Sequence, residues 1–115
     1  MRLTYRKIVG SDGKFLPWLD AFSNKSGVYV IASKRGRIIY VGESHTRALR
    51  KTVTRHFWRW KDSVERKHHC YDPQAVKVAV AAIDSRSAVK RQNDLIHGMK
   101  PRDNLLIPLD GSTPF

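Results

Sequence analysis

The sequence contains a single cysteine, Cys70, among its 115 residues, so no disulfide can form within the chain. A lone thiol fits a reducing compartment. The neighbouring His68 and His69 suggest a zinc site, but structural zinc sites take four ligands at recognised spacings and no second cysteine is present. A solvated loop is the better interpretation of this segment.

Long apolar runs are missing as well. No stretch approaches the roughly 20 apolar residues of a membrane span, and residues 1–10 lack the apolar core of a secretory signal. We therefore expect a soluble intracellular protein without a membrane partner, located in the cytoplasm or at the nucleoid. Repeats, low-complexity tracts and Pro/Gly-rich linkers are also absent, which indicates a single domain over residues 1–115.

Acidic side chains are scarce. Ten Asp and Glu stand against 22 Lys and Arg, which gives a formal net charge of +12. This excess favours a phosphate-rich partner such as nucleic acid. Charge alone leaves two alternatives open: the basic residues can serve solubility, or they can attract an anionic membrane surface. The second is weaker, because the basic residues are not confined to one face of an apolar helix.

The side-chain patterns predict alternating helices and strands. A short helix is expected over residues 15–22, and strands over 27–33 and 38–41 form a hairpin. Opposed residues on paired strands share a face of the sheet. If Lys34-Arg35 or Arg35-Gly36 forms the tip with Tyr29 opposite Tyr40, both phenols share one face, whereas a slip of one residue would separate them. Simple packing is the ordinary role of two such tyrosines.

A second helix is expected to begin at Thr46, a candidate N-cap, because apolar residues then recur at intervals of four. These residues are Leu49, Val53 and Phe57. Trp58 and Trp60 follow, and they fit either base stacking or core packing. A loop is predicted over residues 62–72.

A third strand is expected over residues 76–83, followed by a long helix that begins at Asp84 or Ser85 and stops before Pro101. One face of this helix is apolar apart from a single polar side chain, that of Gln92. The stripe consists of Ala88, Gln92, Leu95, Ile96 and Met99.

The motifs Gly27-Val28-Tyr29 and Tyr40-Val41-Gly42 resemble those of the GIY-YIG nuclease family. The similarity runs over residues 27–104 and includes Leu49-Arg50, Arg55-His56-Phe57 and Lys100-Pro101-Arg102-Asp103-Asn104. The two tripeptides alone are a weak match, whereas their order and spacing with the later residues make it specific. The resemblance implies an α/β (α+β) sandwich, with a central three-stranded antiparallel sheet flanked by helices, that cuts nucleic acid, above all DNA, with one divalent metal ion, Mg²⁺ or Mn²⁺.

The resemblance also implies roles for individual residues. The expected catalytic residues are Tyr29, Tyr40, Arg50 and His56. Among them, Tyr29 would act as the general base and Arg50 would stabilise charge on the phosphoryl group. The residues expected to shape the motifs are Gly27, Gly42 and Asn104. The basic residues expected to contact nucleic acid are Arg47, Lys51, Arg55, Arg59, Lys100 and Arg102.

Residue 92 departs from the family pattern, because Gln92 stands where the family has a metal-binding glutamate. An amide oxygen can bind a metal ion but brings no charge to a hard cation such as Mg²⁺. Asp94 lies roughly 200° further round the helix, which leaves Glu43 as the better substitute. Three alternatives stay open for this departure: an engineered exchange of glutamate for glutamine, a binding module derived from a nuclease, and an enzyme that recruits its metal ion differently.

The sequence thus favours a metal-dependent DNA endonuclease that is weakened or inactive because of Gln92, with no small-molecule cofactor. A non-catalytic nucleic-acid-binding domain is the alternative, and a small RNA-binding protein is the third hypothesis. In an endonuclease, the surplus of Arg and Lys is expected to lower the pKa of Tyr29 from its ordinary value of about 10 and to favour the phenolate. The oligomeric state is not indicated by the sequence.

Overall fold

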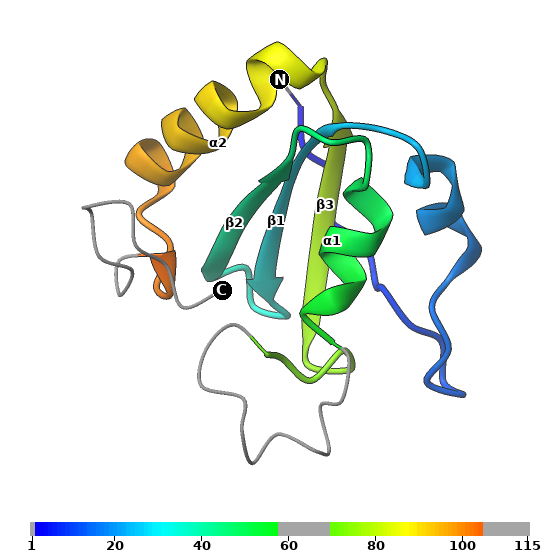
Figure 1. Ribbon diagram of the computed structural model, residues 1–115. Helices are drawn as coiled ribbons and strands as arrows, with labels where there is room; N and C mark the ends of the chain where they lie inside the picture. The colour runs from blue at the N-terminus through cyan, green and yellow to red at the C-terminus, as the bar shows by residue number, and fades with distance from the viewer. Residues whose placement is uncertain (1, 58–69, 105–115) are drawn as a thin grey trace.

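The computed structural model of the chain describes residues 2–57 and 70–104, which form a sheet with helices on both sides (Figure 1). The sheet is antiparallel and has three strands in the order β2-β1-β3. The elements follow one another as the 3₁₀ helix η1 (Pro17–Phe22), β1 (Gly27–Ser33), β2 (Ile38–Ser44), α1 (Leu49–Arg55), β3 (Val76–Ala82) and α2 (Ser85–Met99). This arrangement confirms the predicted α/β (α+β) sandwich with a central three-stranded antiparallel sheet.

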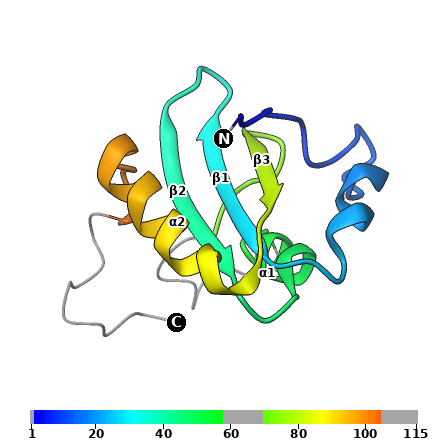
Figure 2. The same ribbon diagram turned by 90° about the horizontal axis from the view of Figure 1, so that it is seen from above.

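The two faces of the sheet bury different sets of side chains. The first face packs against α1 and η1, through residues that include Tyr29, Ile31, Tyr40, Val78, Leu19, Leu49 and Val53. The second face packs against α2, through Val30, Val41, Ala79, Leu95, Ile96 and Met99. Figure 2 shows α2 along one side of the sheet and α1 with η1 away from it. Both motif tyrosines therefore face α1, whereas Gln92 belongs to the helix on the opposite face.

The register of the hairpin differs from the one that would place Tyr29 opposite Tyr40. Tyr29 pairs with Gly42, and Tyr40 pairs with Ile31, while the ladder is irregular between Ile31 and Ala32. The turn closes between Ser33 and Arg37, which shifts the register by one residue, and the irregularity shifts it by one more, so that the partner of Tyr29 is residue 42 and not residue 40. A total shift of two keeps every side chain on its face. The two phenols still share one face, as diagonal neighbours with ring centroids 6.2 Å apart.

Helix α1 begins later than the prediction from Thr46. Arg47 has a left-handed backbone with φ 61°, which breaks the helix before it can start at Thr46. The N-cap is Ala48, and its N–H donates a hydrogen bond of 3.1 Å to Oγ of Ser44 at the end of β2. The helix also ends before Phe57. The apolar spacing thus predicted the helix correctly, but its bounds were too wide.

Helix α2 agrees closely with the prediction. Asp84 is its N-cap, and the carboxylate of Asp84 accepts a hydrogen bond of 3.0 Å from the N–H of Ser87. The C-cap Lys100 has a left-handed backbone with φ 50°, directly before Pro101. Among the helices that the structure describes, none combines the length and the apolar character needed to span a membrane.

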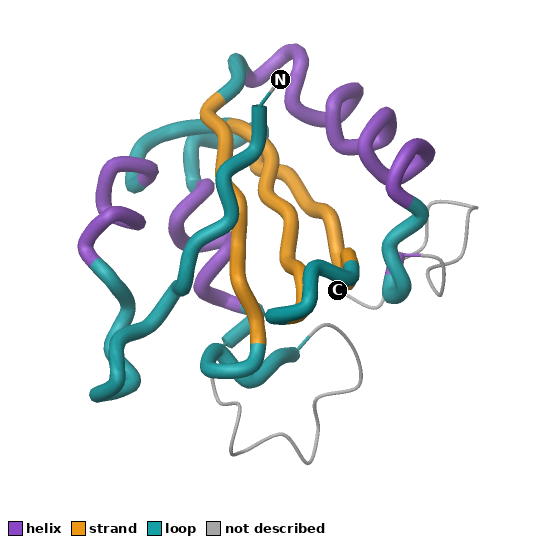
Figure 3. The backbone as a smooth tube through the Cα atoms, turned by 180° about the vertical axis from the view of Figure 1, so that it is seen from behind, coloured by secondary structure: helices purple, strands orange, loops and turns teal. Residues whose placement is uncertain are grey.

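The segments around the sheet complete the fold. The predicted helix over residues 15–22 is a 3₁₀ helix that starts at Pro17, a residue suited to a first helical turn. The N-terminal segment runs beside β3, where Arg6 and Val78 exchange two backbone hydrogen bonds of 2.9 Å (Figure 3). The predictions for Trp58, Trp60, Arg59, His68 and His69 lie outside the described residues.

Candidate active site on the α1 side of the sheet

Four side chains form an aromatic cluster on the α1 side of the sheet: Tyr29, Tyr40, His56 and Tyr71. The hydroxyl of Tyr29 lies 2.6 Å from Nε2 of His56, and both residues are buried. The ring centroid of His56 is 4.8 Å from that of Tyr40, 5.5 Å from that of Tyr29 and 6.0 Å from that of Tyr71. Strand β1, strand β2 and the end of α1 therefore bring Tyr29, Tyr40 and His56 together.

Gly42 makes room for the ring of Tyr29. Because Tyr29 is the strand partner of Gly42, its ring lies where a side chain at residue 42 would begin. A Cβ atom on Gly42 would overlap Cζ and Oη of Tyr29. Any larger residue would therefore push the hydroxyl away from His56, so the glycine of the second motif acts through the tyrosine of the first.

Burial sets the protonation of both motif tyrosines. Tyr29 is 2% exposed, and burial, followed by the nearby Tyr40 and Glu43, raises its pKa well above the ordinary value. Burial and the charge of Glu43 raise the pKa of Tyr40 to about 12. Arg55 acts in the opposite direction on the pKa of Tyr29 but is outweighed. The expectation of a favoured phenolate is therefore wrong, because both hydroxyls keep their protons at neutral pH.

Arg50, the remaining predicted catalytic residue, contacts η1. Its Nε donates a hydrogen bond of 3.0 Å to Oδ1 of Asp20, and the two side chains are 34% and 69% exposed. A pair so open to solvent contributes only about 0–1 kcal/mol. The described contacts of Arg50 thus do not join it to the tyrosines. The arginine whose charge acts on Tyr29 is Arg55.

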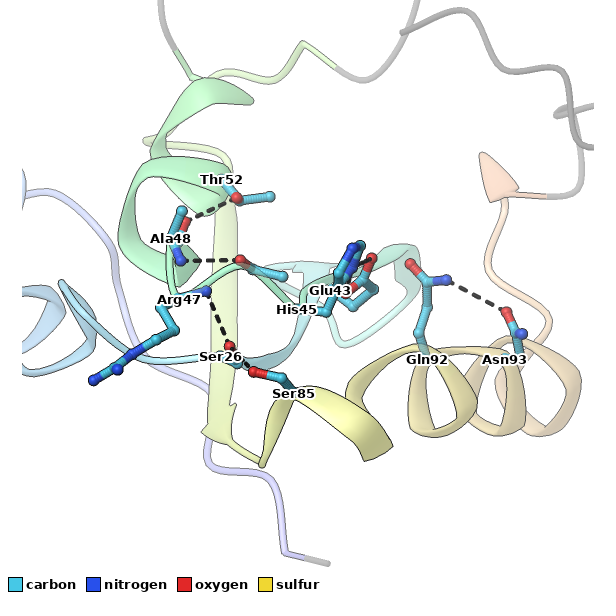
Figure 4. Close-up of polar contacts among 10 residues, drawn as sticks. Ser26, Glu43, His45, Arg47, Ala48, Thr52, Ser85, Gln92 and Asn93 are labelled. Carbon is cyan, nitrogen blue, oxygen red and sulfur yellow. Dashed lines mark hydrogen bonds and ion pairs between the residues drawn. The ribbon is translucent and has the colours of Figure 1, made fainter.

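Gln92 and Glu43 belong to the opposite face of the sheet. Strand alternation places Glu43 on the same face as Val41, which packs toward α2. Both carboxylate oxygens of Glu43 lie 3.1 Å from Nδ1 of His45. The side chain of Gln92 extends from α2 toward this pair (Figure 4), and its amide donates a hydrogen bond of 3.3 Å to Asn93.

The residues around position 92 do not fit a tightly held Mg²⁺ or Mn²⁺. Such cations take several oxygen ligands, usually with carboxylates among them, whereas Gln92 offers a neutral amide and Glu43 is engaged with His45. Within residues 2–57 and 70–104, no three His, Cys, Asp or Glu side chains are grouped so as to hold a metal ion. Asp94 is turned away as expected, since it pairs with Lys90 at 3.1 Å on the exposed side of α2.

The described residues predicted to contact nucleic acid are all exposed. They are Arg47, Lys51 and Arg55 near α1, and Lys100 and Arg102 after α2. Arg47 lines a groove of about 440 Å³ with Lys25, with Asp84, the N-cap of α2, and with Ser85, its first residue. The backbone N–H of Arg47 donates to Oγ of Ser26 at 3.0 Å, and that oxygen is 3.0 Å from Oγ of Ser85 (Figure 4). The loop before α1 is thereby tied to the start of α2.

Asn104 joins the C-terminal motif to the second tyrosine motif. Its Oδ1 accepts a hydrogen bond of 2.7 Å from the N–H of Val41, and its Nδ2 donates one of 2.9 Å to the carbonyl oxygen of Val41. Val41 is buried, and its strand β2 lies at an edge of the described sheet. The amide of Asn104 therefore takes the place of a neighbouring strand at this residue.

Replacing Asn104 with alanine should destabilise the fold. Asn104→Ala leaves the buried N–H and carbonyl of Val41 without these partners, and each unpaired group costs about 1–3 kcal/mol. Urea denaturation followed by circular dichroism would measure the fall in the free energy of unfolding. Asn93→Ala on the exposed side of α2 is the control and should stay within about 0.5 kcal/mol of the parent. Equal stabilities for the two variants would contradict the bridging role.

No sequence pattern points to Tyr71 as part of the cluster. It belongs to neither tyrosine motif and lies at the end of the segment predicted as a loop. Its contacts arise only when the chain returns to the end of α1, where the N–H of Tyr71 donates a hydrogen bond of 2.8 Å to the carbonyl oxygen of His56. The one sequence signal that could have identified Tyr71 as a site residue is its aromatic side chain next to a histidine-rich stretch.

Comparison with known proteins gives one consistent result. The chain is similar to UvrABC system protein C of Alkalilimnicola ehrlichii (30% identity over 98 residues), of Methylococcus capsulatus (31% over 98) and of Koribacter versatilis (34% over 90). The matches cover 85%, 85% and 77% of this chain but only 16%, 16% and 14% of those proteins. No protein-family profile matches the chain. Over most of its own length, the chain is therefore similar to a short segment of UvrABC system protein C.

Proposed function

We propose that this domain is an endonuclease of the GIY-YIG type, which binds DNA and hydrolyses its phosphodiester bonds with a divalent metal ion, Mg²⁺ or Mn²⁺. Cleavage in this form is weak because of Gln92. The observation that carries the proposal is the contact of 2.6 Å between Tyr29 Oη and His56 Nε2, inside a cluster built by both tyrosine motifs. The similarity to UvrABC system protein C supports it. Such a function would place the protein with DNA, in the cytoplasm or at the nucleoid.

The Tyr29–His56 contact suits a proton relay. Because the pKa of Tyr29 is raised, its hydroxyl keeps a proton and can donate it to Nε2 of His56. As Tyr29 passes this proton to the imidazole, its oxygen can take a proton from an attacking water molecule, and the histidine ends up positively charged. This relay needs no standing phenolate, so the raised pKa of Tyr29 does not prevent the tyrosine from acting as a base.

The guanidinium of the partly exposed Arg50 suits a phosphate partner. Arg50 is oriented by Asp20 through a single Nε contact, and guanidinium Nη groups match phosphate oxygens in pairs. A DNA phosphate can compete with Asp20, because the carboxylate of that ion pair is largely exposed and the pair is therefore weak. Arg50 is therefore proposed to bind the phosphoryl group only when DNA is present, with the phosphate either replacing Asp20 or contacting Arg50 beside it.

A carboxylate at residue 92 should increase cleavage. Gln92→Glu adds a negative charge on the side of α2 that points toward Glu43, and this charge would strengthen the binding of Mg²⁺ or Mn²⁺. We expect plasmid nicking to rise by about tenfold or more, since about 1.4 kcal/mol of added transition-state stabilisation gives that factor. Initial nicking rates against metal concentration, for both chains, measure the effect.

Asn93→Asp is the matched control for Gln92→Glu. It introduces the same charge one residue further along α2, on an exposed position, and should not increase nicking. A folded Gln92→Glu chain that cleaves no faster than its parent would contradict the proposal that Gln92 weakens cleavage. Strong cleavage by the parent chain would show that a different residue serves the metal ion.

A non-catalytic nucleic-acid-binding domain is the second candidate, favoured by the absent charge at Gln92 and the raised pKa values of both motif tyrosines. It predicts binding that weakens steeply with salt, no need for a metal ion and no cleavage by either chain. Competition between duplex DNA and structured RNA, measured by fluorescence anisotropy, would also separate DNA from RNA as the preferred partner.

A further inference from the structure

The buried pair Tyr71 and Asp103 takes no part in the chemistry proposed above. Tyr71 Oη donates a hydrogen bond of 2.5 Å to Oδ2 of Asp103, and both residues are 8% exposed. Burial and this hydrogen bond raise the pKa of Tyr71, so its hydroxyl remains a donor. A short hydrogen bond to a carboxylate is one of the stronger kinds in proteins, so this contact holds the ring of Tyr71 firmly.

Tyr71 meets His56 at two points. The N–H of Tyr71 donates a hydrogen bond of 2.8 Å to the carbonyl oxygen of His56. Their rings are also stacked, with centroids 6.0 Å apart and planes inclined by 28°. Tyr71 therefore fixes both the backbone and the ring of the residue that faces Tyr29.

Asp103 is itself fixed to the sheet. Its N–H donates a hydrogen bond of 2.9 Å to the carbonyl oxygen of Ile39, the residue before Tyr40 in β2. Arg102 donates to the same carboxylate from Nε at 2.7 Å and from Nη2 at 3.1 Å. The carboxylate that holds Tyr71 is thus anchored to the strand that carries the second tyrosine motif.

Stacking on His56 does not by itself need a hydroxyl or a carboxylate. A phenylalanine would cover the imidazole as well, and burying a carboxylate costs free energy of desolvation. A satisfied buried polar pair instead specifies one arrangement of the rings. We infer that Tyr71 and Asp103 are positioning residues that hold the imidazole of His56 with Nε2 toward Tyr29. The catalytic consequence of this inference rests on the proposed function.

The first test measures the orientation of His56 directly. Ring ¹⁵N chemical shifts are recorded on the full chain, and the His56 signals are assigned by their loss in His56→Asn. Tyr71→Phe should move the Nε2 shift of His56 toward the value in Tyr29→Phe, in which the hydrogen bond cannot form. An unchanged Nε2 shift in folded Tyr71→Phe would overturn the inference.

Two further variants keep the test decisive. Tyr5→Phe removes a hydroxyl outside the cluster, from a ring that contacts Lys77, and should leave His56 unchanged. If Tyr71→Phe does not fold, Asp103→Asn replaces it, because asparagine keeps the shape and an acceptor oxygen while the charge is removed. The same movement of the Nε2 shift, smaller in size, is then expected, and its absence overturns the inference.

The second test is kinetic and uses the Gln92→Glu background. Tyr71→Phe should lower kcat by roughly 10- to 100-fold through misplacement of the relay, with KM unchanged because Tyr71 is buried. An unchanged kcat would contradict a positioning role. If Gln92→Glu does not cleave DNA at all, the proposed function fails, while the Nε2 shift of His56 still decides whether Tyr71 positions the imidazole.

Discussion

Tyr29→Phe is expected to slow DNA nicking by about 100- to 10,000-fold in the Gln92→Glu background, the range over which a positioned acid–base group acts. The change removes only the hydroxyl that lies 2.6 Å from Nε2 of His56. DNA binding should be kept, because Tyr29 is 2% exposed and its raised pKa leaves it uncharged. Single-turnover nicking and fluorescence anisotropy would measure the two quantities separately.

The fold should tolerate Tyr29→Phe, since one hydrogen bond is lost, at a cost of about 1 kcal/mol. Tyr5→Phe is again the control, because it deletes a hydroxyl on the other side of the sheet, and its rate should equal that of the parent. If Tyr29→Phe cleaves DNA at the parent rate, the Tyr29–His56 pair has no chemical role. The cluster would then be a packing feature of a nucleic-acid-binding domain.

Gly27→Ala is expected to have the largest effect on stability. Gly27 begins the central strand β1, and a Cβ atom there would overlap the carbonyl oxygen of Ala81 and stand 3.0 Å from Cα of Ala82. Both neighbours are backbone atoms of β3, so the strands would have to separate. We expect the free energy of unfolding to fall by about 3 kcal/mol or more, and Tm by more than about 10 °C.

Gly98→Ala is the matched control for this substitution. Gly98 lies within α2, and a Cβ atom there would meet no atom of the described residues within 4 Å outside its own stretch of helix. Alanine favours a helix over glycine by about 1 kcal/mol, so Gly98→Ala should raise Tm slightly. Thermal denaturation of both variants tests the pair. A cooperative transition for Gly27→Ala at the parent Tm would show that β1 and β3 can move apart at no cost.

Local patterns predicted the elements of this fold well. Helix α2 was predicted from its apolar stripe and from Asp84, because capping depends on residues close in sequence. The hairpin was predicted too, but not its register, because neither the three-residue turn 34–36 nor the irregularity between Ile31 and Ala32 has a signature in strand periodicity. The predicted start of α1 was wrong for a similar reason. The left-handed backbone of Arg47 depends on hydrogen bonds that Arg47 donates to Ser26 and Asn24, which are distant in sequence.

The candidate site was only partly predictable. The motif spacing indicated that Tyr29, Tyr40 and His56 lie close together, because the paired strands and the following helix are neighbours in the chain. The predicted direction of the Tyr29 pKa shift was wrong. Net charge is a property of the whole molecule, whereas the pKa of one side chain depends on its burial and on its near neighbours. The contact between Tyr71 and Asp103 joins residues far apart in sequence, and no local pattern encodes it.

The amide of Asn104 has a consequence for association between copies of the chain. An edge strand with free N–H and carbonyl groups is a template on which another chain can add a strand. Asn104 occupies both groups of Val41 at the edge formed by β2. The same side chain that supports the second tyrosine motif thus also guards against intermolecular sheet extension, so a truncated or substituted chain that lacks it should be prone to aggregation.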